Sequence, residues 1–140
     1  MAKAVCLQAI DIVYGGSGGY KAVAQASLDV AEGEFVALVG PTGCGKSTLL
    51  NAAAGLLEPA KGRVEIFGKQ LTGLNEKAGY LFQQDALMPW KTAAENIAIG
   101  LEVKGVDQIE ARRQAEDWLL QVGLKGFGAR YPHQLSGGQR

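Results

Sequence analysis

Apolar and polar residues follow two periods along this chain, and the change between them falls near residue 90. In the earlier part, apolar positions either alternate with polar ones or form short runs, as they do in strands. The run FVALVG is continuous, which is typical of a strand buried on both faces. Glycine-containing stretches at residues 14–20, 32–33 and 68–69 predict turns between these segments. The segments expected to form strands are residues 4–13, 21–31, 35–40, 62–67, 70–71 and 77–85.

The later part of the chain has the spacing of helices. Thr92 and Glu95 stand three residues apart, as in a capping box, and predict a helix over residues 93–103. Asp107 can cap a second helix, which Gly123 would end. One apolar stripe of this second helix is expected to be buried, and it comprises Ile109, Ala115, Trp118, Leu119 and Val122.

Composition narrows the class of protein without identifying it. The 140 residues are enough for one domain. Fourteen lysines and arginines balance fourteen aspartates and glutamates, so no basic field indicates nucleic acid as a partner. Cys6 and Cys44 stand in unrelated contexts and predict no disulfide framework, which favours a reduced compartment. No apolar run approaches the ~20 residues of a membrane span, so the chain is not expected to cross a bilayer.

The stretch GPTGCGKST satisfies the pattern G-x-x-x-x-G-K-[ST] of a phosphate-binding loop. Its backbone N–H groups can surround phosphate oxygens where glycines leave room, Lys46 supplies a positive charge, and the Ser47 hydroxyl can bind Mg²⁺. The loop follows the run FVALVG and opens a helix expected to stop near Gly55, a context that an accidental glycine-rich turn would lack. A nucleoside triphosphate site is therefore predicted. Its loop residues are Gly40, Pro41, Thr42, Gly43, Cys44, Gly45, Lys46, Ser47 and Thr48.

A second candidate anion site lies in the stretch LSGGQR at residues 135–140. Ser136 precedes two glycines at the start of an expected helix, so a hydroxyl, bare backbone amides and a helix dipole would act together. We expect this site to meet a nucleotide held by a second copy of the chain, because the two half-sites of one chain would face outward on separate subdomains.

Three stretches together resemble one known family. GPTGCGKST, LFQQDALMPW and LSGGQ are similar to the Walker A loop, the Q-loop and the signature motif of the nucleotide-binding domain of ATP-binding cassette (ABC) transporters. The resemblance covers the whole chain and implies an α/β fold with a P-loop NTPase (RecA-like) core, truncated after the signature motif. The implied division is an N-terminal antiparallel β subdomain plus P-loop core over residues 1–91, and a helical subdomain over residues 92–140.

The resemblance also implies roles for residues outside the loop. Gln83 stands in the register of the glutamine that links Mg²⁺ and the attacking water to the membrane subunits, so Ser47 and Gln83 are the expected metal ligands. Tyr14 resembles the aromatic residue that stacks on adenine, and Tyr20 is the alternative because the glycines between them leave the alignment open. The signature residues expected to contact the nucleotide are Ser136, Gly137, Gly138 and Gln139.

The residues that split the phosphate bond in this family are not found in the sequence. They would be an apolar strand ending in Asp, a Glu directly after it and a later His, and neither YLFQQD nor WLLQVG fits that strand. We therefore assign no catalytic residue. The chain by itself is expected to be unstable or aggregation-prone and to lack measurable ATP turnover, although the complete domain would be an ABC-type ATP hydrolase.

The resemblance implies an energy-coupling subunit that uses ATP and Mg²⁺ at the cytoplasmic face of a membrane. Its expected partners are a second nucleotide-binding subunit in a head-to-tail dimer, transmembrane permease subunits and, indirectly, a periplasmic or extracellular binding protein. The stretch LMPWKTAAENIAIGLEVKGV resembles importers of small anions such as nitrate, sulfonate or taurine. Two alternatives stay open: a regulatory nucleotide-binding module without turnover, and a soluble family member in DNA repair or translation.

Overall fold

The computed structural model describes residues 2–15, 18–84 and 86–140. Clustering of contacts divides the chain into two compact units, one up to Tyr80 and one from Leu81 to Arg140. Residues 16–17 of the expected glycine turn and Asp85 of the Q-loop stretch lie outside the described residues.

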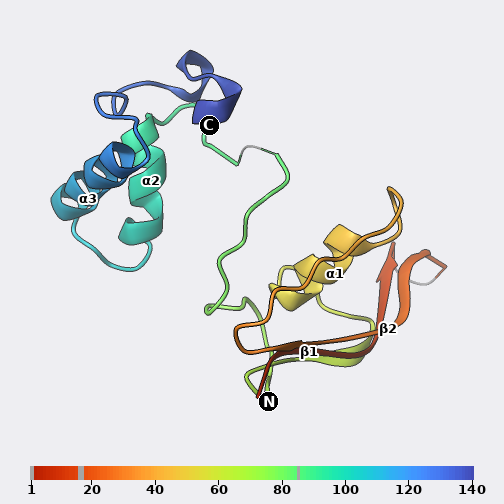
Figure 1. Cartoon of the computed structure of the whole chain (residues 1–140). Coiled ribbons are helices and arrows are strands. Elements are labelled where there is room, and N and C mark those ends of the chain that lie inside the picture. The colour runs from red at the N-terminus through yellow and green to blue at the C-terminus, as the bar shows by residue number, and fades with distance from the viewer. Residues whose placement is uncertain (1, 16–17, 85) are drawn as a thin grey trace. The chain divides into compact units, whose positions relative to one another are not determined.

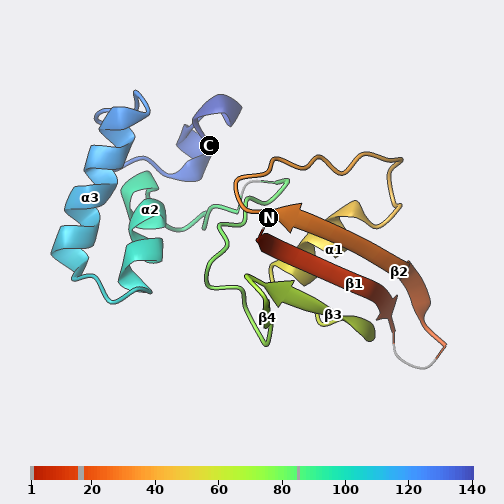
Figure 2. The ribbon, with the colours of Figure 1, turned by 60° about the horizontal axis from the view of Figure 1, so that its bottom comes forward.

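The first unit contains an antiparallel sheet and one helix. The strands lie in the order β2-β1-β3-β4, so β1 is flanked by β2 and β3. Figures 1 and 2 show this sheet with the helix α1 on one face. The elements are β1 (Lys3–Tyr14), β2 (Tyr20–Ala31), α1 (Lys46–Ala53), β3 (Lys61–Ile66) and β4 (Lys69–Gln70).

The central strand β1 bends where its register with both neighbours shifts. Ala9 adopts a φ of 47° at this place, and Gln25 of β2 adopts the same left-handed value. Gly62 of β3 lies so close to the bend that a Cβ there would overlap the carbonyl oxygens of Gln8 and Ala9. Glycine at this position therefore allows β3 to pair with a bulged β1.

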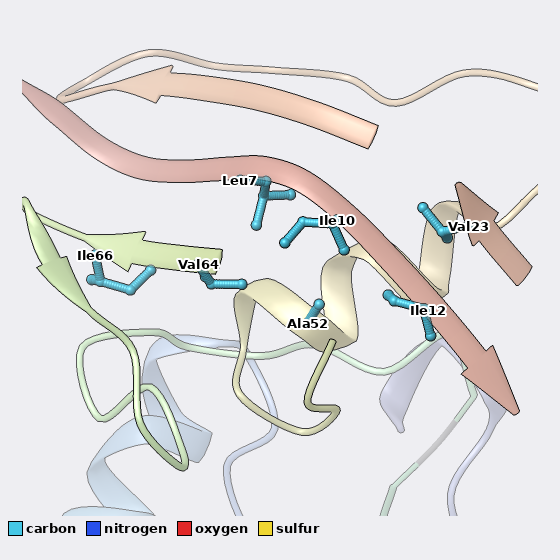
Figure 3. Close-up of a cluster of buried hydrophobic side chains, with 7 residues drawn as sticks. All are labelled: Leu7, Ile10, Ile12, Val23, Ala52, Val64 and Ile66. Carbon is cyan, nitrogen blue, oxygen red and sulfur yellow. The ribbon is translucent and has the colours of Figure 1, made fainter. Parts of the chain in front are cut away.

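A small apolar core joins the sheet to α1. Figure 3 shows its side chains gathered between β1, β3 and α1, with Ala52 of the helix beneath the strands. Ala52 is 1 % exposed, and its small size lets the helix approach the sheet closely. The buried members are Leu7, Ile10, Ile12, Val23, Ala52, Val64 and Ile66.

The second unit packs two helices, α2 (Ala93–Glu102) and α3 (Gln108–Gln121), followed by two 3₁₀ turns, Pro132–Gln134 and Gly137–Gln139. The capping box is present as predicted: Glu95 N–H donates to Thr92 Oγ1 at 3.4 Å, and Thr92 N–H donates to Glu95 Oε2 at 2.8 Å. Asp107 caps α3 by accepting from Ile109 N–H at 2.9 Å. The buried core of this unit consists of Ala93, Ala94, Ala98, Ala111, Ala115, Leu119 and Leu135.

Two of the expected strands are wrong. Residues 35–40 form no strand, and Phe35 and Val39 are 93 % and 90 % exposed. The described residues of 77–85 form no strand either, and Leu81 is 97 % exposed. A strand is stable only where neighbours take up its N–H and C=O groups, and no strand in the described part of the chain pairs with either segment.

Two smaller expectations also need correction. The turn between β3 and β4 is formed by Phe67 and Gly68, which both have positive φ, rather than by Gly68–Lys69. In α3 the expected apolar stripe is only partly buried, because Ile109, Trp118 and Val122 are exposed. None of the helices in the described residues is long and apolar enough to span a membrane.

Candidate functional site

The phosphate loop of the first unit runs from Gly40 to Gly45 and leads directly into α1. Gly43 and Gly45 have φ values of 84° and 94°, a left-handed conformation that side chains with a Cβ rarely adopt. Gly45 is also packed against β2, because a Cβ there would lie 2.9 Å from both the Ala22 carbonyl oxygen and Val23 Cγ2. The loop conformation therefore depends on glycine for two separate reasons.

Lys46 holds the loop closed from within. Its Nζ donates to the carbonyl oxygens of Gly40 at 2.8 Å and Pro41 at 2.7 Å, and lies 3.6 Å from Cys44 Sγ. No carboxylate of the described residues forms an ion pair with it. The Lys46 ammonium is thus bonded to neutral carbonyl oxygens. A negatively charged phosphate oxygen can replace them and form a stronger, charge-assisted hydrogen bond.

The start of α1 offers further donors to an anion. In the described part of the chain, the N–H groups of Lys46, Ser47 and Thr48 have no hydrogen-bond acceptor, as expected for the first turn of a helix. The partial positive charge of the helix terminus acts at the same place. The cradle therefore fits a polyphosphate, and the exposed Ser47 hydroxyl is available as one oxygen ligand for Mg²⁺.

Tyr14 lies beside this loop, whereas the Tyr20 side chain forms no hydrogen bond to it among the described residues. The Tyr14 hydroxyl is 3.5 Å from Thr48 Oγ1, and the Tyr14 side chain is 44 % exposed. Tyr20, its cross-strand neighbour, is 69 % exposed. The geometry favours Tyr14 over Tyr20 as the aromatic residue of the site. Within the first unit the structure brings together Tyr14 and residues 40–48.

The other predicted site residues belong to the second unit. Gln83 is exposed in an irregular segment ahead of α2. Leu135, only 8 % exposed, anchors the signature stretch in the helical core, while Ser136, Gly137 and Gly138 are exposed. These three residues are thus accessible to a partner, and their contact with a nucleotide stays a prediction.

Gly137–Gln139 form a 3₁₀ turn directly after Ser136, and the contribution of a helix dipole at this place stays a prediction. The turn is held by Gln139, whose Oε1 accepts from Ser136 N–H at 2.9 Å. Its backbone N–H donates in return to the Ser136 carbonyl, also at 2.9 Å. Gln139 therefore shapes the turn that exposes Ser136.

Two structural features, one in each unit, went unpredicted. Asn96, inside α2, bonds to the backbone of residues 88–92. A polar residue in the first turn of an expected helix was a signal in the sequence that could have indicated these bonds. Asp11 is a buried carboxylate of β1 that is bonded to β2. No group of three or more His, Cys, Asp or Glu residues in the described ranges could hold a metal ion.

Comparison with known proteins shows the family to which the chain belongs. A profile described as "ABC transporter" matches residues 23–140. The chain is 47 % identical over 114 residues to the taurine import ATP-binding protein TauB of Pseudomonas aeruginosa, covering 81 % of this chain and 43 % of that protein. It is 45 % identical over 120 residues to an uncharacterized ABC transporter ATP-binding protein of Methanocaldococcus jannaschii, covering 86 % and 45 %.

Among solved structures, the chain is similar to the ATP-binding cassette MJ0796 in a dimeric post-hydrolysis state bound to ADP and Pi. The TM-score is 0.81 at 34 % sequence identity, over 96 % of this chain and 64 % of that one. The fold and the phosphate loop thus define an ATP-binding cassette. The chain belongs to the ABC transporter family. It spans about half the length of the curated relatives it matches.

Proposed function

We propose that this chain is the N-terminal portion of the ATP-binding, energy-coupling subunit of an ABC transporter. In this proposal residues 1–91 form the β subdomain and the P-loop core, and residues 92–140 form the helical subdomain. The subunit lies at the cytoplasmic face of a membrane. The observation that carries the proposal is the loop of residues 40–48. In the described part of the chain, glycine geometry, free amides at the start of α1 and a lysine bonded to carbonyl oxygens rather than to a carboxylate meet there.

Each residue of the site has a separate task in binding ATP–Mg²⁺. Lys46 exchanges its two carbonyl partners for the β/γ-phosphate oxygens, and the amides of residues 43–48 donate to the same group. Ser47 and Gln83 supply oxygen ligands to Mg²⁺. Tyr14 stacks on the adenine ring from its position beside Thr48.

The signature residues act on a nucleotide held by another subunit. Ser136, Gly137, Gly138 and Gln139 are presented on an exposed turn, and a second nucleotide-binding subunit places its ATP against them in a head-to-tail dimer. Dimers of the similar cassette MJ0796 support this arrangement. Closure of the dimer moves transmembrane permease subunits, which receive their cargo from a periplasmic or extracellular binding protein.

We propose a small anion such as taurine, another sulfonate or nitrate as the transported substrate. The support is the similarity to TauB of Pseudomonas aeruginosa, whose name records taurine import. For the 140-residue chain by itself we propose ATP binding without turnover. The sequence contains no apolar strand ending in Asp-Glu that could position the attacking water.

Nucleotide affinity of the purified chain tests the proposal, with Lys46→Ala as the diagnostic variant and Lys69→Ala as its matched control. Removing the Lys46 ammonium should weaken ATP–Mg²⁺ binding roughly 10- to 100-fold, the size of a lost charge-assisted hydrogen bond. Lys69 is an exposed residue of β4, and its removal should leave the affinity unchanged. Titration calorimetry gives both values. Equal affinities in the two variants would refute the phosphate site.

A further inference from the structure

The turn ahead of α2 carries a large apolar side chain on a well-bonded backbone. Lys91 N–H donates to the Met88 carbonyl at 3.1 Å and closes the turn. Pro89 has a fixed φ and stiffens it. Trp90, next in the turn, is 72 % exposed. The backbone that carries the Trp90 indole is therefore largely ordered before any partner binds.

Asn96 supplies a second set of bonds to the same turn. Its Oδ1 accepts from Met88 N–H at 2.8 Å, and its Nδ2 lies 3.2 Å from the Met88 carbonyl oxygen. The same Nδ2 lies 3.0 Å from each of the Lys91 and Thr92 carbonyl oxygens, so its two N–H groups are shared among three acceptors. One carboxamide therefore fastens both ends of the turn to the helix.

The part of α2 that holds Asn96 is itself fixed. Ala93 N–H donates to the Arg130 carbonyl at 2.8 Å, and Ala94 N–H donates to the Gly128 carbonyl at 3.0 Å. These bonds occupy N–H groups that a helix start otherwise leaves free. The carboxamide of Asn96 thus extends from a rigid element toward a turn that contains no other side-chain bond in the described residues.

We propose that Asn96 is a positioning residue, which fixes the Met88–Lys91 turn so that Trp90 meets the permease subunit in one conformation. The identity of the partner rests on the proposed function, whereas the bonds that carry the proposal lie within the second unit. Exposed tryptophans on preorganised backbone are frequent centres of binding energy. Without the carboxamide the turn must be ordered during binding, and the interaction weakens.

Backbone order measured by NMR relaxation tests the proposal directly. In Asn96→Ala the order parameters of the Trp90 and Lys91 amides should fall from about 0.85 to below about 0.6, while the helical circular dichroism is kept. Asn75→Ala is the matched control, since Asn75 also bonds to backbone groups, at Ala53 and Lys77 of the first unit. That control should leave the turn unchanged. Unaltered order in Asn96→Ala would overturn the proposal.

Asn96→Asp separates the chemistry of the carboxamide from its size. Its carboxylate can still accept from Met88 N–H but faces the carbonyl oxygens of Lys91 and Thr92, so the turn should be disordered at neutral pH. Acidification protonates the new carboxyl group, restores one donor and should recover the order. The parent chain at the same pH values controls for Glu95, whose pKa is lowered by bonds from Thr92. Absence of any recovery would count against the proposal.

The functional arm uses the assembled transporter. Asn96→Ala should reduce transport-coupled ATP turnover by no more than Trp90→Ala does, and the double variant should lose no more than Trp90→Ala alone, because Asn96 acts through Trp90. Additive losses would overturn the proposal. Neither variant should change the ATP affinity of the chain more than about twofold. If the parent chain bound no ATP, the proposed function would fail, while the order parameters would still decide the role of Asn96.

Discussion

Gly45 shows how a single missing Cβ shapes the phosphate loop. Its φ of 94° is left-handed, and β2 lies so close that no methyl group fits beside the Ala22 carbonyl. Gly43 has a similar φ of 84°, but the space around its Cα is open. The two glycines therefore separate backbone strain from crowding within one loop.

We expect Gly43→Ala to lower the free energy of unfolding by about 1–2 kcal/mol through backbone strain alone. Gly45→Ala should cost at least about 1 kcal/mol more, because its methyl group also overlaps β2. Gly137→Ala, at an open position without positive φ, should be nearly neutral. Urea unfolding midpoints measure all three. Equal effects at positions 43 and 45 would show that crowding at Gly45 is relieved.

Asp11 is the buried charge of the sheet. It is 6 % exposed, and its carboxylate accepts from Gln25 N–H at 2.8 Å and from Lys21 Nζ at 3.1 Å. These two bonds, the backbone one first, lower the pKa of Asp11 below its ordinary value. Gln25 stands at the bulge of β2, so the carboxylate stabilises an irregular part of the sheet.

The lowered pKa of Asp11 predicts a pH dependence of stability. The unfolded state has the ordinary pKa of about 3.9 and binds a proton before the folded state does. The stabilisation is therefore present above about pH 4 and is lost as the pH falls through the folded pKa. Asp11→Asn should lower the free energy of unfolding at pH 7 and reduce its further decrease at low pH. Urea midpoints measured between pH 7 and pH 3 test this prediction. Glu58→Gln, at an exposed position, is the control and should leave the loss of stability at low pH unchanged.

At the scale of elements, packing against α2 determines which face of α3 is buried. Ala111, Ala115 and Leu119 follow at intervals of four residues and are buried. Ala111 was absent from the stripe expected from the sequence, while Ile109 of that stripe is 82 % exposed. The alanines of α2 lie in the same core, and small residues let two helices approach closely. The expected stripe contained two of these buried residues, Ala115 and Leu119, but its large apolar members Ile109, Trp118 and Val122 are exposed.

This choice of face predicts opposite results for two leucine-sized side chains of α3. Leu119→Ala should lower the free energy of unfolding by about 2–5 kcal/mol, because it opens a cavity in the helical core. Ile109→Ala should change it by less than about 0.5 kcal/mol. Helical circular dichroism during urea unfolding gives both values. A loss at Ile109 as large as the loss at Leu119 would show that Ile109 is buried, as the sequence had indicated.

Elements with local signals could be predicted from the sequence, and elements that need distant partners could not. Thr92 and Asp107 act on amides two or three residues away, so both helix starts were found. The run FVALVG has the composition of a buried strand, but its bonds depend on neighbours that the local sequence does not specify. The site divides in the same way: the loop from Gly40 was readable, whereas the bonds of Asn96 required the folded turn.

At the scale of the whole molecule, the chain combines exposed apolar residues with a net charge of zero. Phe35 and Val39 are almost fully exposed in the first unit, as is Leu81 in the second. Fourteen positive and fourteen negative side chains leave no net repulsion between copies. Surface of this kind favours association, and the aggregation expected from the sequence stays a prediction.

A charge-matched pair of double variants tests this cause of association. Phe35→Lys/Val39→Lys should reduce light scattering at neutral pH without lowering the urea midpoint, because both side chains contact little. Gln70→Lys/Thr72→Lys adds the same charge at exposed polar positions and leaves the apolar surface intact. The first pair should therefore scatter less than the second. Equal scattering would assign the effect to net charge rather than to apolar exposure.

The start of α2 has a mechanical consequence. Its first two amides are tied to the carbonyls of Arg130 and Gly128, and its first turn is tied to the backbone around Trp90. Leu135, a few residues beyond Arg130, is buried against the same helix core. A displacement of the Trp90 backbone would therefore act on the start of α2, which is bonded to the segment that leads on to Ser136.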